Sequence, residues 1–270
     1  DDMADESMND RLKGQDVPLA ERMRPQSLEE MVGQEHLLGP GKFLGQAIRN
    51  RRIFSVLFWG PPGSGKTTLA RLIGRYTQLP FRAFSAVTSG VKELRQIVSE
   101  AREARAAWGK PTLLFVDEIH RFNKAQQDAF LPHVESGLIV LIGATTQNPS
   151  FEVIPPLLSR SRTVILHPLG RKEIRRLLLR ALKDAERGLG KWNIELTDEA
   201  LDHLVGYSQG DARVSLNALE SSALYASEIR GGDPILIDAD MVAQALSQKP
   251  LPYDKHGEEH YNIISAFHKS

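Results

Sequence analysis

A glycine-rich loop followed by a lysine and a threonine is the first pattern in the chain with evident chemistry. Residues 60–67 read Gly-Pro-Pro-Gly-Ser-Gly-Lys-Thr and fit G-x-x-x-x-G-K-[ST]. Glycines let backbone N–H groups turn towards phosphate oxygens, and a helix beginning near Gly65 would direct its positive end at the same anion. Lys66 would reach the β- and γ-phosphates, and the Thr67 hydroxyl would ligate Mg²⁺. The predicted nucleotide-binding residues of this loop are Gly60, Pro61, Pro62, Gly63, Ser64, Gly65, Lys66, Thr67 and Thr68.

Two adjacent carboxylates follow an apolar run further along the chain. Asp117 and Glu118 end the segment TLLFVDE at 112–118. Two buried carboxylates side by side are costly unless a metal and a water occupy the site. Asp117 would hold Mg²⁺, and Glu118 would orient or deprotonate the attacking water. Alone, the pattern is also an ordinary strand followed by a helix cap. Together with the loop it favours hydrolysis over passive nucleotide storage.

Polar side chains in three further segments of the chain are candidates for contacts with the γ-phosphate or the attacking water. Thr146 or Asn148 follows an apolar run and could bond the attacking water, although Asn148 before Pro149 is also a turn-forming residue. The segment Ser159-Arg160-Ser161-Arg162 precedes another apolar run, and the planar fork of an arginine there suits the charge that develops in the transition state. One chain does not reveal whether it acts in its own subunit. Arg213 could reach the γ-phosphate from a second domain, or it could be a solvated arginine.

Alternating apolar runs and helical stretches must position these side chains. We expect strands at 54–59, 81–86, 112–118, 138–146 and 163–168, and helices at 65–76, 91–108 and 123–135. Strands separated by helices of this length indicate a mostly parallel sheet covered on both faces. After Pro168 four helices are expected, at 171–187, 198–207, 211–229 and 238–246, and no strand. The prediction is a nucleotide-binding α/β domain at 17–168 and a small all-α lid at 169–248.

Composition limits the remaining classes of protein. The 270 residues carry 34 Lys+Arg and 34 Asp+Glu, with 41% hydrophobic and 25% charged residues, which excludes disordered, collagen and coiled-coil chains. No apolar run approaches the roughly 20 residues that span a bilayer, so no membrane association is expected. The absence of Cys excludes disulfide scaffolds and cysteine-ligated metals. Residues 1–16 are expected to be a disordered acidic tail, and 249–270 the start of a truncated C-terminal helical domain.

Direct signals for nucleic acid are weak. The helix expected at 171–187 carries seven basic and three acidic side chains, a net charge of +4, and a solvated helix face is the favoured interpretation. No interleaving of aromatic and basic residues for base stacking is visible. Trp59, Trp108 and Trp192 are interpreted as core or boundary residues. The residues alone therefore do not predict a DNA site.

These motifs together resemble the clamp-loader-like branch of the AAA+ ATPases. The matching segments are GPPGSGKTT, FVDEIH, GATTQNPS, LLSRSR and GDARVSLNALE. Three longer segments are similar to the replication-associated recombination protein A family, called Werner-helicase-interacting protein in eukaryotes: PLAERMRPQSLEEMVGQEHLLGPGKFL, EIHRFNKAQQDAFLPHVESG and ATTQNPSFEVIPPLLSRSR. The resemblance covers about residues 17–270.

The resemblance implies roles that spacing does not establish. Thr146 and Asn148 lie in the region of the first sensor, Arg160 at the trans-acting arginine finger and Arg213 at the second sensor. Residues 17–34 would pack on adenine, with Pro25, Val32 and Gly33 near the base. The implied sheet order is 5-1-4-3-2, and the implied cofactors are ATP and Mg²⁺.

The resemblance also implies a DNA-stimulated ATPase at stalled replication forks and single-strand gaps. Its partners would be DNA, single-stranded-DNA-binding protein and further copies in a tetramer or ring. The location would be cytoplasmic, nucleoid-associated in a bacterium or nuclear in a eukaryote. A clamp-loader subunit, a branch-migration motor and an ATP-binding switch protein with incidental turnover stay as alternatives. Family members continue past residue 270 into a helical domain that supports assembly, so the oligomeric state and trans catalysis by Arg160 stay open.

Overall fold

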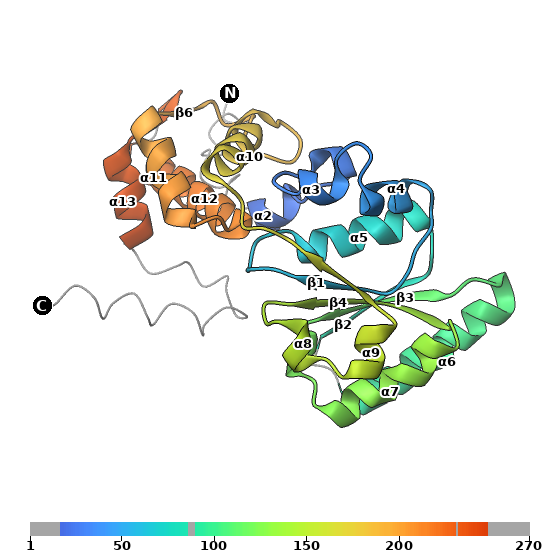
Figure 1. Ribbon diagram of the computed structural model, residues 1–270. Helices are drawn as coiled ribbons and strands as arrows, with labels where there is room; N and C mark the ends of the chain where they lie inside the picture. Colours follow the sequence, from blue (N-terminus) through green and yellow to red (C-terminus); the bar gives the residue numbers. More distant parts are fainter. Residues whose placement is uncertain (1–16, 86–89, 231, 248–270) are drawn as a thin grey trace, which may run out of the picture.

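A five-stranded parallel sheet carries the glycine-rich loop (Figure 1). The computed structural model describes residues 17–85, 90–230 and 232–247, so the predicted N-terminal tail and C-terminal helical start lie outside the described residues. The strands are β1 (Val56–Trp59), β2 (Phe81–Ser85), β3 (Thr112–Asp117), β4 (Ile139–Thr145) and β5 (Arg162–Ile165). Their order is β2-β3-β4-β1-β5 with every pair parallel, which confirms the expected 5-1-4-3-2.

Helices cover both faces of this sheet (Figure 1). One face packs α4 (Phe43–Arg49) and α5 (Lys66–Thr77), and the other packs α6 (Val91–Trp108), α7 (Lys124–Glu135) and the short α9 (Pro155–Ser159). Each face has its own apolar core, because successive strand residues point to opposite sides. Phe58 is buried with Leu69 on the α5 side, whereas Leu57 is buried with Phe130 on the α7 side. The α/β fold expected from the sequence is therefore confirmed.

Local signals explain where the helices begin and end. Gly65 adopts φ +103°, which lets the chain turn directly from the loop into α5. The side chain of Asn123 accepts a hydrogen bond from the backbone N–H of Gln126, and the Gln126 side chain accepts one from the backbone N–H of Asn123, a capping box that starts α7. Gly109, with φ +68°, ends α6 in the left-handed conformation. The bounds of the predicted strands and helices of this half agree with the structure to within three residues, and the largest difference is that β5 ends at Ile165 instead of 168.

The second half is helical and in addition holds a small sheet. Its helices are α10 (Arg171–Lys183), α11 (Asp198–Ser208), α12 (Ala212–Ile229) and α13 (Ala239–Ser247). These are the four helices expected from the sequence, but α10 ends four residues before the expected 187. The expectation that no strand follows Pro168 was wrong, because β6 (Ile194–Leu196) pairs in parallel with β7 (Ile235–Ile237). Ile235 and Ile237 are buried and Leu236 is exposed. Strands of three residues are too short for their alternation to be distinguished from loop sequence.

The N-terminal segment, residues 17–38, joins the two halves. It contains α2 (Leu19–Arg22), the 3₁₀ turn η1 (Leu28–Glu30) and α3 (Glu35–Leu38). Leu19 and Met23 are buried in the apolar core of the lid, whereas Leu28 and Met31 are buried in the core on the α5 face of the sheet. A boundary near residue 169 stays a prediction, but this segment packs on both sides of it.

Two other sequence expectations have clear outcomes. The side chain of Trp108 is 68% exposed at the end of α6, so its interpretation as a core or boundary residue was wrong. It is the last residue of that helix, beyond the reach of the sheet that covers the earlier turns. Trp192 is buried, as expected. Among the described helices none is both long and apolar enough to cross a membrane.

Candidate nucleotide-binding and hydrolysis site

A cavity of about 980 Å³ lies where the glycine-rich loop, the N-terminal segment and the lid meet. It is at the carboxyl end of the parallel strands, where open α/β sheets bind their ligands. The predicted site residues that line it are Pro25, Val32, Pro62, Gly63, Ser64, Gly65, Lys66, Thr67, Thr68, Asp117, Glu118, Thr146 and Arg213. The predicted site residues outside its lining are Gly33, Gly60, Pro61, Asn148 and Arg160.

Lys66 begins α5 and turns its ammonium group back over the loop. Its Nζ donates hydrogen bonds to the carbonyl oxygens of Gly60 at 2.7 Å and of Pro61 at 2.8 Å. Burial lowers the pKa of Lys66 to about 8, although the nearby carboxylates of Asp117, Asp211 and Glu118 favour the charged form. A bound anion would remove this destabilisation of the charge, so the site is electrostatically suited to phosphate.

The lid contacts the glycine-rich loop at Gly63. Its carbonyl oxygen accepts a hydrogen bond from the backbone N–H of Ala212, at 3.3 Å. Gly63 has φ +72°, and a Cβ there would lie 2.1 Å from Oδ1 of Asp211. The same Asp211 oxygen caps α12 by accepting bonds from the backbone N–H groups of Arg213, at 2.8 Å, and Val214, at 3.1 Å. Only glycine fits this contact, which seats the first turn of α12, and with it Arg213, against the loop.

Asp117 and Glu118 lie at the end of β3 on the opposite wall. Oδ1 of Asp117 accepts a hydrogen bond from the backbone N–H of Glu118, at 3.0 Å. Burial raises the pKa of Asp117, and the negative charge of Glu118 raises it further. The hydrogen bond from the Glu118 backbone and the positive charge of Lys66 act in the opposite direction. A divalent cation at Asp117 would offset both costs. Together with the Thr67 hydroxyl, this donor set fits Mg²⁺, which takes one or two protein oxygens beside substrate phosphates.

The end of β4 separates the two candidates for a first sensor. Thr146 lines the cavity. Asn148 instead caps the short helix α8 (Pro149–Glu152), because its Oδ1 accepts a hydrogen bond from the backbone N–H of Ser150 at 3.0 Å. Neighbouring Thr145 fixes this corner: its Oγ1 accepts from the backbone N–H of Gln147, at 2.9 Å, and lies 2.9 Å from Nδ1 of His120.

Arg160 lies outside the cavity of its own chain. It follows α9 and its Nη2 is 2.9 Å from Oε1 of Glu135, at the end of α7. Its side chain is 43% exposed. The guanidinium is thus on the surface of the α/β half, where a second molecule could reach it.

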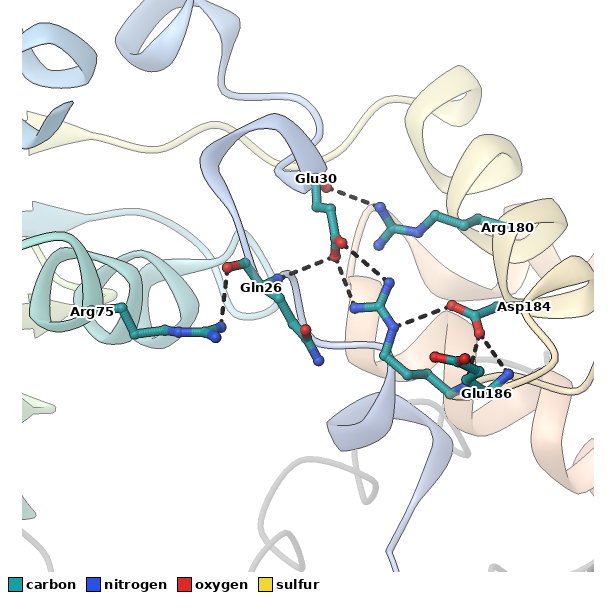
Figure 2. A network of polar contacts seen from close by, with 7 residues as sticks. Gln26, Glu30, Arg75, Arg180, Asp184 and Glu186 are labelled. Atoms are coloured by element: carbon teal, nitrogen blue, oxygen red, sulfur yellow. Dashed lines mark hydrogen bonds and ion pairs between the residues drawn. The ribbon is translucent and has the colours of Figure 1, made fainter.

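Figure 2 shows the polar contacts through which the N-terminal segment links α5 to the lid. Arg75 of α5 donates to the carbonyl oxygen of Gln26, at 3.0 Å. Glu30 accepts two hydrogen bonds from the Arg187 guanidinium, at 3.0 and 3.2 Å, and its carbonyl oxygen accepts one from Arg180, at 3.2 Å. Arg187 also bonds Asp184 at the end of α10. Because Glu30 and Arg180 line the cavity, a change in the position of the lid would move part of the cavity wall.

Many residues of the cavity wall were not among the predicted site residues, and Arg24 and Asp211 are two of them. Arg24 donates from Nη1 to the Thr68 hydroxyl of α5, at 2.9 Å. Asp211 was expected to begin the helix at 211–229, and an acidic residue at a helix start was the signal for a cap, but its contact with Gly63 is between distant parts of the chain. Gly33, which was predicted near the base, adopts φ +76° and approaches Leu169, whose Cδ2 would lie 2.5 Å from an added Cβ.

Comparisons with known proteins identify the families and relatives that this chain resembles. Residues 56–169 match the family described as "ATPase family associated with various cellular activities (AAA)", and residues 190–270 match "AAA C-terminal domain". The chain is 48% identical to replication-associated recombination protein A of Haemophilus influenzae and 47% identical to that of Escherichia coli, over 94% of this chain and 56% of each relative. It is 36% identical to the ATPase WRNIP1 of Dictyostelium discoideum, over 94% of this chain and 30% of that protein.

A solved structure shares the fold. The Thermotoga maritima RuvB Holliday junction branch migration motor is 26% identical, with a TM-score of 0.64, over 83% of this chain and 72% of that chain. The present chain spans only about 56% of the length of the bacterial relatives.

Proposed function

The chain belongs to the replication-associated recombination protein A family of AAA ATPases, and on that premise we propose that it binds and hydrolyses ATP in the cavity between the glycine-rich loop and the lid. One observation carries the proposal: a single cavity is lined by the lysine that follows the glycine-rich loop, two carboxylates from one strand end and an arginine from the lid. These are Lys66, Asp117, Glu118 and Arg213. A passive nucleotide store needs the lysine but has no use for the second carboxylate.

Hydrolysis in this cavity would divide the chemistry among these side chains. Glu118 accepts a proton from a water as the water oxygen bonds to the γ-phosphorus, and the bond from that phosphorus to the bridging oxygen of ADP breaks. Lys66 pairs with the β- and γ-phosphate oxygens, whose negative charge shifts during this step. Thr146 is placed to hold the attacking water or the γ-phosphate. Arg213 contacts the γ-phosphate from the lid, so lid position and nucleotide state depend on each other.

The Thr67 hydroxyl and the Asp117 carboxylate would hold Mg²⁺. When bound, this ion supplies neutralisation of charge on the β- and γ-phosphates. Pro25 and Val32 line the cavity on the N-terminal segment and would contact the adenine. Gly33 would act through its close approach to Leu169, which sets where this segment lies.

The whole protein would use this turnover on DNA. We propose a DNA-stimulated ATPase in the cytoplasm, working on stalled forks and single-strand gaps together with single-stranded-DNA-binding protein. The relatives named for replication-associated recombination support this role. Arg160 would complete the site of a neighbouring subunit in a tetramer or ring, since it lies outside its own cavity and is exposed.

Two variants test the proposed activity. Lys66→Ala removes the cation of the loop and should abolish ATP binding. Glu118→Gln keeps the shape of the side chain, so binding should persist while phosphate release falls by about 100-fold or more. Both are compared with the unmodified chain, with and without forked or gapped DNA. Unchanged phosphate release by Glu118→Gln would refute the assignment of the base.

The similarity to RuvB favours a second candidate, a branch-migration motor. The two roles differ in the DNA that stimulates turnover. A fork or gap is expected to stimulate more than a four-way junction of the same length. The opposite preference would support the branch-migration role and leave the ATPase assignment intact.

A further inference from the structure

We propose that Arg121 is a positioning residue that fixes the carboxylate of Glu118 for its role as the base. This inference rests on the proposed function. The observation behind it is an ion pair next to the cavity: Nε of Arg121 lies 2.6 Å from Oε2 of Glu118. Arg121 itself does not line the cavity, whereas Glu118 does.

The backbone conformation of Glu118 is one that neighbouring contacts must stabilise. Its φ of 52° and ψ of 47° place a non-glycine residue in the left-handed region. Residues with side chains adopt this conformation at a cost and keep it where their surroundings fix it, often at functional sites. The backbone N–H of Arg121 donates to the Glu118 carbonyl oxygen at 2.8 Å, so Arg121 holds Glu118 through its main chain as well as its side chain.

Arg121 itself is well anchored. It ends the 3₁₀ turn η2 (Ile119–Arg121), in which Ile119 is fully buried in the core on the α7 face of the sheet. The middle residue, His120, lies 2.9 Å from the Thr145 hydroxyl at the end of β4, next to Thr146. The 3₁₀ turn is thus held by the buried side chain of Ile119 and by the contact of His120 with the end of β4. Because Arg121 belongs to this turn, its guanidinium binds Glu118 from a fixed part of the backbone.

The ion pair occupies one carboxylate oxygen of Glu118 and leaves the other oxygen available to a water. Oε2 is bound by Arg121, while Oε1 has no hydrogen bond or salt bridge to any described residue. A base needs one lone pair directed at its water, and it needs a defined rotamer to direct it. The pair is between half-exposed side chains, 47% and 39% accessible, and such pairs contribute little to stability. Positioning therefore explains this contact better than stabilisation of the fold.

A double-mutant cycle tests the inference. Arg121→Ala is expected to lower kcat for ATP about tenfold, with KM and nucleotide affinity unchanged, because misplacement of a reacting group acts on the chemical step. In a Glu118→Gln background the same change should cause no further loss. Arg121→Lys keeps a cation and should lose less than Arg121→Ala. Arg82→Ala is the matched control, since Arg82 forms an exposed ion pair with Glu100 away from the cavity.

The outcomes separate this inference from the proposed function. Phosphate release that is unaffected by Glu118→Gln would refute the base itself. A large effect of Glu118→Gln with wild-type or faster turnover in Arg121→Ala would overturn the positioning role alone, and so would equal losses in both backgrounds of the cycle. Thermal melting of each variant identifies a folding defect. If Arg121→Ala melts early, Arg121→Gln replaces it in the same cycle and is judged by the same criteria.

Discussion

Nucleotide binding by this protein is expected to weaken in alkaline solution because of Lys66. Burial lowers the pKa of its ammonium group to about 8 in the free protein. A bound polyphosphate stabilises the charged form and raises that pKa, so binding takes up a proton wherever the free lysine is neutral. Affinity should therefore be constant well below pH 8 and should fall as the pH rises through that value.

The size of the effect follows from the titration of one group. Between pH 7 and pH 9 the charged fraction of a group with a pKa of about 8 falls from about 0.9 to about 0.1. The affinity for ADP should fall about tenfold over that range, or about 1.4 kcal/mol. Binding at pH 9 should take up about 0.9 proton per nucleotide, whereas binding at pH 6.5 should take up almost none from this group.

The assay is a titration with a fluorescent ADP at constant ionic strength from pH 6.5 to 9.5, in EDTA so that no metal contributes. Calorimetry in two buffers of different ionisation enthalpy measures the proton uptake. The control is Lys66→Arg, whose guanidinium stays charged over this range. An affinity that stays level to pH 9.5, or an equal loss in Lys66→Arg, would show that deprotonation of Lys66 does not control nucleotide binding.

Three further predictions address the loop, the N-terminal segment and the end of β4. Gly63→Ala should weaken ADP binding about tenfold or more in the same titration, because its Cβ would overlap the cap of α12. The control is Gly109→Ala, which should leave the affinity for ADP unchanged. Gly109 also has a positive φ, +68°, but no atom lies within 4 Å of the added Cβ. Glu30→Gln should lower the free energy of unfolding in urea by about 1 kcal/mol at pH 7. Burial raises the pKa of Glu30, but hydrogen bonds from Arg187 and from a backbone N–H outweigh it and hold the pKa below 4.5. The difference in unfolding free energy between wild type and Glu30→Gln should therefore be present above pH 4.5 and disappear as the pH falls further. A difference that grows on acidification would contradict this prediction. Thr146→Val should lower phosphate release about tenfold or more. Asn148→Ala should lower the melting temperature through loss of a helix cap and change turnover less than about twofold. The reverse pattern would identify Asn148 as the sensor.

The fold was predictable where the sequence signal is local and repeated. The apolar residues of α6 recur with the period of a helix over 18 residues, and its predicted bounds, 91–108, match the structure. The glycine-rich loop was predictable for a different reason, because backbone approach to phosphate restricts the residue types themselves. In contrast, β6 and β7 are three residues each, and the two are paired only by the tertiary structure of the lid.

The parts of the site that were missed depend on contacts between distant segments. The carboxylate of Asp211 meets Gly63 only because α12 folds back over the loop. The sequence left Thr146 and Asn148 as alternatives, and in the structure Thr146 lines the cavity whereas Asn148 caps the helix that Pro149 starts. Arg121 is three residues from Glu118, close enough for a sequence signal, but a charge after a strand is usually solvated. The left-handed backbone that brings the two together is visible only in three dimensions.

We propose that ATP binds and is cleaved in the cavity beside Lys66. A crystal structure of the protein with Mg²⁺ and a non-hydrolysable ATP analogue would test this assignment. The triphosphate is expected to lie along residues 62–67, with its terminal phosphate between Lys66 and Glu118 and the metal against Thr67 and Asp117. A nucleotide bound elsewhere, or a terminal phosphate directed away from Glu118, would contradict the account.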